Sequence, residues 1–163
     1  MRIMMIEKIK KTIIVSVEEE RLKITRKDIE LYLSDVKAAI QKNRYRIDRN
    51  SKRQDNLDLF LNYMIDEAKA KRILLSLTPA DFSEIRQNEH KGFEHEQLYV
   101  FGKDVALSRR LDIGDEKIPL YIKINKLDNQ FVIIVSFHKQ TYPLTYAFPS
   151  RAESQSQCPH FCA

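Results

Sequence analysis

Three side chains that could act on a phosphate group lie close together in the C-terminal half of the chain. Tyr121 and Lys123 alternate within one apolar run, and His138 ends a second run after the four-residue turn 127–130. Two β-branched runs around a short polar turn predict a β-hairpin over residues 120–138. A phenol, an ammonium and an imidazole on one sheet face would suit binding and proton transfer at phosphorus.

The hydrophobic pattern predicts a register in which Ile122 pairs with Val135. Strand side chains alternate between the two faces of a sheet. The apolar face would hold Leu120, Ile122, Ile124, Ile133, Val135 and Phe137, and the other face Tyr121, Lys123, Ile134, Ser136 and His138. Tyr121 then faces Ser136, and His138 lies roughly 6 to 7 Å further along at about 3.3 Å per residue. A slip of one residue would move Lys123 and His138 to opposite faces.

Helical patterns occupy the first half of the chain. Thr25 and Asp28 are spaced to cap a helix that ends near Lys42. A second pattern begins near Asp55 and continues to about Thr78, where Thr-Pro predicts a further helix start. The two apolar stripes are Ile29, Leu33, Val36 and Ile40, and then Leu57, Phe60, Leu61, Met64 and Ala68.

Strand patterns dominate the second half. We expect a strand at 98–101, a turn at 102–104, the hairpin at 120–138 and a last extended segment at 142–148. Two further strands are expected near the N-terminus, at 12–17 and 21–25. Residues 84–97 form a polar stretch with His90 and His95, for which a solvated loop, a substrate-contacting loop and a metal site all stay open. This order predicts one α+β domain over residues 1–148, with an antiparallel sheet packed against two or more N-terminal helices.

The composition excludes several classes of protein. Only three glycines occur among 163 residues, and they match neither a dinucleotide-binding G-x-G-x-x-G loop nor a phosphate-binding P-loop. No apolar run approaches the roughly 20 residues that span a bilayer, and charged residues interrupt the N-terminal 17, so we expect neither a membrane helix nor a signal peptide. Because the body of the chain has no cysteine, we expect a protein of the reducing cytoplasm, and no motif indicates a cofactor.

Both cysteines lie in the last six residues, in the sequence CPHFC. Cys158, His160 and Cys162 are three possible zinc ligands, whereas a structural site takes four. We therefore expect residues 149–163 to be a disordered tail and the protein to hold no metal, with a weak or intermolecular metal site as the alternative.

Positive charge is concentrated between residues 37 and 53, where seven basic residues accompany one acid. Such a segment favours a polyanion or an acidic protein as partner, and a solvated face is the alternative. Residues 43–54 are expected to form a loop or a short edge strand. The candidate RNA- or partner-binding residues are Arg44, Arg46, Arg49, Lys52 and Arg53, together with Arg86 and Lys139.

Six short segments follow one another along the chain: Val36-Lys37 with Ile40, LLSL at 74–77, DF at 81–82, a predicted strand at 98–101, LYIKI at 120–124 and IVSFH at 134–138. In this order the chain resembles the MqsR-type toxins of bacterial toxin–antitoxin pairs, which are mRNA interferases with a RelE-like fold. The similarity covers roughly residues 29–139. It implies mRNA and a cognate antitoxin protein as partners, with a homodimer as a further assembly and no membrane contact.

The resemblance also implies roles for particular residues. Tyr121 matches a functional tyrosine, His138 stands where the family has a lysine, and the family's glutamine falls at or beside Gln97. A family lysine after Asp-Phe is Glu84 here, with Arg86 two positions along.

The implied reaction is metal-independent RNA cleavage by attack of a ribose 2′-hydroxyl. His138 would transfer protons, while Lys123 and either Arg86 or Lys139 would stabilise phosphate charge. Tyr121 would position the phosphate or stack on a base. A non-catalytic RNA- or protein-binding module with the same basic surface is the alternative function.

Overall fold

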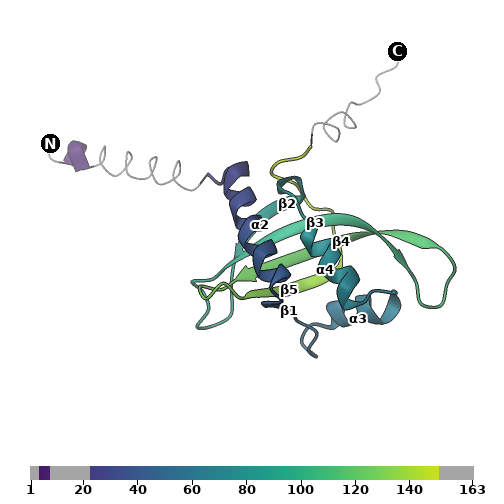
Figure 1. The fold of residues 1–163 in the computed structure, drawn as a ribbon. Helices are drawn as coiled ribbons and strands as arrows, with labels where there is room; N and C mark the ends of the chain where they lie inside the picture. The colour runs from purple at the N-terminus through teal and green to yellow at the C-terminus, as the bar shows by residue number, and fades with distance from the viewer. Residues whose placement is uncertain (1–3, 8–22, 151–163) are drawn as a thin grey trace, which may run out of the picture.

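Residues 23–150 form a five-stranded sheet with helices on one face (Figure 1). The computed structural model describes residues 4–7 and 23–150. Its helices after residue 23 are α2 (Arg26–Gln41), α3 (Gln54–Asn62) and α4 (Glu67–Leu75), and its strands are β1 (Tyr45–Ile47), β2 (Phe82–Gln87), β3 (Gln97–Ser108), β4 (Asp115–Lys126) and β5 (Val132–Lys139). The strand order is β1-β5-β4-β3-β2, and only the β1–β5 pair is parallel. The predicted α+β class is confirmed, and the parallel edge strand makes the sheet mixed.

Helix α2 begins where the cap pattern predicts. The Asp28 amide donates to the Thr25 hydroxyl at 3.2 Å, and the Thr25 amide donates to the Asp28 carboxylate at 2.8 Å. This reciprocal pair satisfies two amides that have no partner within the helix. The Thr25 hydroxyl also donates to the Asp28 carboxylate at 2.7 Å, and this bond, followed by that from the Thr25 amide, lowers the pKa of Asp28 because both favour its ionised form.

The hydrophobic core lies between the helices and one face of the sheet. Ile29, Val36 and Ile40 of α2 are fully buried, and so are Ile124 and Phe137 on the strands below. Truncating one of these side chains to alanine is expected to lower the free energy of unfolding by about 2–5 kcal/mol. The helices therefore cover one face of the sheet, and the opposite face is the one that a ligand can reach.

The second predicted helix is two helices, because the chain turns between residues 63 and 66. Tyr63 has an extended backbone and pairs with Arg109 in an isolated bridge. Asp66 then caps α4 by accepting a hydrogen bond from the Lys69 amide at 2.7 Å. Leu61 and Met64 were expected on the buried stripe, but the turn leaves them 65% and 58% exposed.

Residues 78–87 also differ from expectation. Thr78 and Asp81 do form a capping box, but only one 3-10 turn, Pro79–Asp81, follows it. Phe82 then starts β2, an edge strand whose side chains are mostly polar and exposed. The sequence predicts no strand here because, apart from Phe82, only Ile85 is apolar in this segment.

Gly102 does not make the predicted turn. Strand β3 passes straight through residues 102–104, and the chain reverses at 109–114 instead. A Cβ at Gly102 would lie 2.5 Å from the Tyr146 hydroxyl and 2.7 Å from Leu144 Cδ1. This glycine is thus required by a close approach of the C-terminal segment rather than by a turn.

That C-terminal segment, residues 140–148, is not a strand. It crosses over the sheet, where the Ala147 amide donates to the Phe82 carbonyl at 3.0 Å and the Ser83 hydroxyl to the Thr145 carbonyl at 2.7 Å. We call residues 140–148 the C-terminal strap. The Phe148 ring ends it by stacking on Phe82 with 6.1 Å between centroids.

Some expectations concern residues outside the described ranges. These are the strand at 12–17, the first two residues of the strand at 21–25, and the cysteine-containing tail from residue 151; residues 23–25 are described and are not in a strand. Among the described helices, none has the length and apolar character required to cross a bilayer.

Candidate functional site

A β-bulge in β5 decides how the hairpin strands face. Ile122 pairs with Phe137, not with Val135 as predicted, whereas Ile124 pairs with Ile134. The register shifts between these pairs, so Val135 is an extra residue without a partner of its own. Ile134 consequently lies on the helix-covered face and is fully buried.

Ile133 and Val135 lie on the opposite face, where they line a pocket. The prediction that both are on the core face and Ile134 is on the open face is therefore wrong. The physical reason is the single extra residue, which exchanges the faces of all side chains on one side of it. The uninterrupted apolar run at residues 131–135 is compatible with either arrangement.

Asn56 of α3 holds the bulge in place. Its side-chain amide donates to the carbonyls of Asp48 at 2.6 Å and Val135 at 3.2 Å, and its oxygen accepts from the Phe137 amide at 2.8 Å. Asn56 is 1% exposed. The side chain thus replaces a neighbouring strand for β5 where β1 has already ended.

Tyr121 and His138 lie directly opposite each other in adjacent strands. Their rings stack with 5.2 Å between centroids and 16° between planes. Lys123 pairs with Ser136 in the next row, and its Nζ lies 5.7 Å from the Tyr121 ring centroid. Phenol, ammonium and imidazole therefore occupy one face, closer together than the predicted register had them.

His138 presents one ring nitrogen as a base. Its Nδ1 lies 2.8 Å from the Lys139 carbonyl oxygen, which can only accept, so Nδ1 carries the hydrogen and donates. Nε2 makes no hydrogen bond to any described residue and holds a lone pair in this tautomer. The ring borders a hollow of about 400 Å³ that Asp55, Asp58 and Lys139 also line.

Lys123 is half-buried and surrounded by further cations. Burial lowers the pKa of its ammonium, and the positive charges of Arg53 and Arg86 lower it further, while Glu84 and Glu89 oppose the shift. An anion bound here would relieve both the desolvation and the repulsion between like charges.

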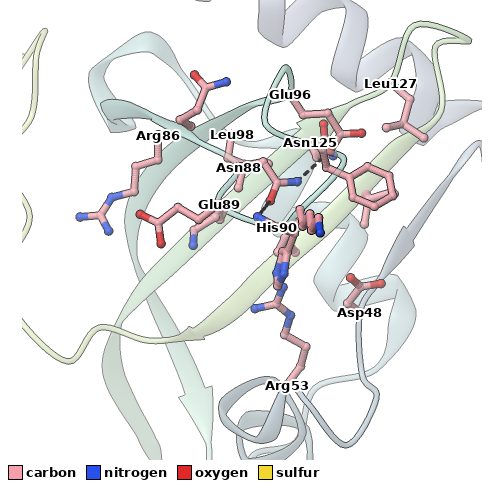
Figure 2. Close-up of a pocket in the computed structure, with 16 residues that line it drawn as sticks. Asp48, Arg53, Arg86, Asn88, Glu89, His90, Glu96, Leu98, Asn125 and Leu127 are labelled. Atoms are coloured by element: carbon pink, nitrogen blue, oxygen red, sulfur yellow. Dashed lines mark hydrogen bonds between the residues drawn. The ribbon is translucent and has the colours of Figure 1, made fainter.

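A pocket of about 810 Å³ opens beside Lys123 on this face (Figure 2). Its base is formed by side chains of β3, β4 and β5, and its rim by loop 88–96 and by Arg53. Arg86 borders it from the edge strand β2, where its guanidinium is paired with Glu84 at 2.6 Å. The volume is sufficient for a small organic ligand.

The carboxylate of Glu96 lies at the end of the pocket opposite Arg53 and is held by hydrogen bonds (Figure 2). Oε2 of Glu96 accepts from the side-chain amides of Asn125 at 2.7 Å and Asn88 at 2.9 Å. Asn88 accepts from the His90 amide at 3.1 Å and thereby shapes loop 88–96. These contacts tie the loop to β4.

The C-terminal strap partly covers the tyrosine. Tyr121 is 7% exposed, and Tyr142 of the strap lies against it with 6.5 Å between ring centroids. The Arg86 guanidinium donates to the Tyr142 hydroxyl at 3.4 Å. Burial raises the pKa of Tyr121, so its phenol stays protonated at neutral pH.

Gln97 is not part of this cluster. It precedes Leu98, which pairs with Asn125 on the pocket face, so Gln97 points to the opposite side of β3. It borders a different hollow, together with Tyr32 and Tyr99. The glutamine that the family resemblance implies is thus separated from Tyr121 by the sheet itself.

The predicted basic residues divide into two groups. Arg53 and Arg86 line the pocket with Lys123. The others lie on the exposed surface: Arg44 donates to the Asn129 carbonyl, Arg46 and Arg49 pair with Asp48 and Glu67, and Lys52 and Lys139 are exposed. Residues 45–47 form the short edge strand, one of the two predicted alternatives.

Sequence reasoning missed Asn125, Glu96 and Phe93 in the pocket. Asn125 had a signal, because it continues the period-two polar positions of Tyr121 and Lys123. Glu96 and Phe93 had none, since they lie in a loop without periodicity. No group of three or more potential metal ligands occurs within residues 4–7 and 23–150.

Comparisons of the chain with protein-family models, with curated proteins and with solved structures gave no match.

Proposed function

We propose that the protein is a metal-independent endoribonuclease that acts on mRNA in the cytoplasm as the toxin of a toxin–antitoxin pair. The observation that carries this proposal is the row of reactive groups on β4 and β5: the stacked Tyr121–His138 pair with Lys123 beside it. The sequence resemblance to MqsR-type toxins supports the same function. The site's chemistry is compatible with RNA, whose 2′-hydroxyl supplies the nucleophile.

In the proposed reaction, His138 Nε2 takes the proton of the 2′-hydroxyl. The 2′-oxygen forms a bond to phosphorus while the bond from phosphorus to the 5′-oxygen breaks, which leaves a 2′,3′-cyclic phosphate and a 5′-hydroxyl. The Lys123 ammonium stabilises the negative charge of the pentavalent intermediate and returns a proton to the leaving oxygen. Its lowered pKa favours that transfer.

The geometry supports the action of both groups on one phosphate. Lys123 and His138 are diagonal neighbours across the β4–β5 pair. Diagonal neighbours lie about 7–8 Å apart and their Cβ atoms are somewhat closer, so a phosphate between the two side chains would be within reach of both. Tyr121 acts as a positioning residue, because its stacked ring fixes the tilt of the imidazole.

Flanking RNA would contact the exposed cations of residues 44–53. The same surface is suited to an acidic antitoxin protein, which would block the site by occupying it. Arg44, Arg46 and Lys52 are exposed, and they lie in or beside the edge strand β1 in sequence, close to the pocket-lining Arg53.

The test is cleavage of a single-stranded RNA by the purified chain in the presence of EDTA. We expect cyclic-phosphate products from the wild type and a rate at least about 100-fold lower from His138→Gln, since general acid–base catalysis contributes about 10²–10⁴-fold. Gln97→Ala is the matched control and should retain the wild-type rate. A His138→Gln variant that cleaves normally would exclude His138 from the reaction.

A non-catalytic RNA-binding module is the second candidate, and the burial of Tyr121 beneath the C-terminal strap favours it. It predicts RNA binding that weakens steeply with salt while the RNA is recovered intact. Gel analysis of the same binding reactions distinguishes the two functions.

A further inference from the structure

The 810 Å³ pocket is chemically polarised, with different groups at its two ends. The end at Lys123 holds three cations, Lys123, Arg53 and Arg86, with the carboxylate of Glu89 beside them. The end at Glu96 consists of hydrogen-bond acceptors and amides from loop 88–96 and β4. Figure 2 shows Arg53 on one side and Glu96 with Asn125 on the other.

Glu96 has unused capacity to accept hydrogen bonds. Both amide donors, Asn88 and Asn125, bind Oε2, and Oε1 accepts from no described residue. A carboxylate accepts at both oxygens and cannot donate. Because two amides hold it, the group is oriented before any ligand arrives.

Apolar groups connect the two ends. Leu98 and Val135 are buried in the pocket wall, with Ile133 beside them. Phe93 lies on the rim, 52% exposed, where its ring is available for stacking. An exposed aromatic ring above an apolar wall suits a flat heteroaromatic ring.

We infer that this pocket binds one nucleotide of the RNA, with a phosphate at Lys123 and Arg53 and the base against Phe93 and Glu96, and that it selects bases with an exocyclic amino group. This inference rests on the proposed function and names the substrate's base class. Adenine, cytosine and guanine each offer an amino N–H to Oε1. Uracil presents a single ring N–H between two carbonyl oxygens, which repel the carboxylate.

The test uses the four nucleoside 3′-monophosphates as probes and the full chain, with affinities measured by calorimetry or by NMR titration. Adenosine, cytidine and guanosine monophosphates are expected to bind about tenfold or more tightly than uridine monophosphate, the factor that a hydrogen bond to a charged group contributes. Equal affinity for all four nucleotides, or no binding of any, overturns the inference.

Glu96→Gln keeps an acceptor for Asn88 and Asn125 but adds a donor at the ligand side, so we expect it to remove the discrimination against uridine. Glu94→Gln, in the same loop but outside the pocket, is the matched control and should preserve it. Retained discrimination in Glu96→Gln contradicts the inference.

Phe93→Ala is a second variant. The Phe93 side chain is 52% exposed, so its removal should not disturb the fold. It should weaken the binding of all four nucleotides by a similar factor of about 5–150, which corresponds to stacking of about 1–3 kcal/mol per base. Unchanged affinity in this variant removes the stacking part of the inference.

The same measurements separate the inference from the ribonuclease proposal. Selective nucleotide binding without cleavage of any RNA supports the pocket and contradicts the enzyme. Cleavage that proceeds equally at all bases, with equal nucleotide affinities, supports the enzyme and contradicts the pocket.

Discussion

The Tyr121 ring stacks on the His138 imidazole across the β4–β5 strand pair, with 5.2 Å between their centroids. Together with the hydrogen bond from His138 Nδ1 to the Lys139 carbonyl, this contact restrains both the tilt and the rotation of the imidazole. Nε2 is therefore held in a defined direction on the open face. A phenol that is buried and protonated can serve here as a support without taking part in proton transfer.

Tyr121→Phe should keep this support, and Tyr121→Ala should lose it. The phenylalanine variant retains the stacked ring, so we expect RNA cleavage within about threefold of the wild type. The alanine variant loses an aromatic contact of about 0.5–1.5 kcal/mol and should cleave about threefold to tenfold more slowly. Single-turnover rates on one RNA substrate measure both. An inactive Tyr121→Phe variant would instead mean that the hydroxyl takes part in the reaction.

Lys123→Met should stabilise the fold while abolishing phosphate binding. The folded protein disfavours the charged lysine, so below the folded pKa the ammonium carries a full stability penalty. Between the folded pKa and the ordinary value of 10.5 the unfolded chain binds more protons, so wild-type stability relative to the variant rises with pH. The advantage of Lys123→Met is thus largest at neutral pH and shrinks towards pH 10.5. Urea unfolding of both proteins from pH 7 to 10.5 measures it, and a wild type that is more stable than the variant at pH 7 contradicts it.

Asn56→Ala should destabilise the protein and disturb the bulge. The variant leaves the Phe137 amide and the carbonyls of Asp48 and Val135 without their partner, at about 2–4 kcal/mol. Asn62→Ala, an exposed asparagine of the same helix, is the control and should stay within about 0.5 kcal/mol of the wild type. Denaturant unfolding gives both values. Equal stabilities of the two variants would show that the buried amide does not hold β5.

Gly102→Ala should loosen the C-terminal strap. The new Cβ would lie 2.5 Å from the Tyr146 hydroxyl, 2.7 Å from Leu144 Cδ1 and 2.9 Å from Gln140 Nε2, so these side chains must move. We expect the Ala147 amide, bonded to the Phe82 carbonyl, to exchange hydrogen about tenfold faster or more. Exchange in the central β3–β4 pair should stay unchanged and serves as the internal control. Undisturbed protection at Ala147 would mean that the strap accommodates the methyl group.

Features held by local interactions followed from the sequence. The start of α2 depends on two residues three positions apart, Thr25 and Asp28, whose mutual hydrogen bonds need no other part of the chain. The hairpin turn at 127–130 closes with a hydrogen bond from the Leu127 amide to the Phe131 carbonyl. Period-two alternation likewise put Tyr121 and Lys123 on one face. Each of these depends on a few neighbouring residues, and their types are visible in the sequence.

Contacts between segments that are distant in the sequence decided the position of the β5 bulge, the residues that line the pocket and the role of Gly102. Val135 bulges because Asn56, from another helix, meets its carbonyl, and the bulge determines which apolar residues line the pocket. A glycine at position 102 is compatible with a turn and also with a close approach of the C-terminal strap. Only the position of Tyr146 in the folded chain shows that the close approach is the reason.

The sequence by itself thus determined the α+β class, the start of α2 and the polar face of Tyr121 and Lys123. Tertiary structure decided that Tyr121 meets His138 directly, that Gln97 lies on the opposite face, and that Glu96 and Asn125 complete a pocket beside Lys123. The physical reason is that periodicity gives the direction of a side chain from its own strand. Which residue it meets depends on register and on bulges, and these are set by hydrogen bonds and packing from elsewhere in the chain.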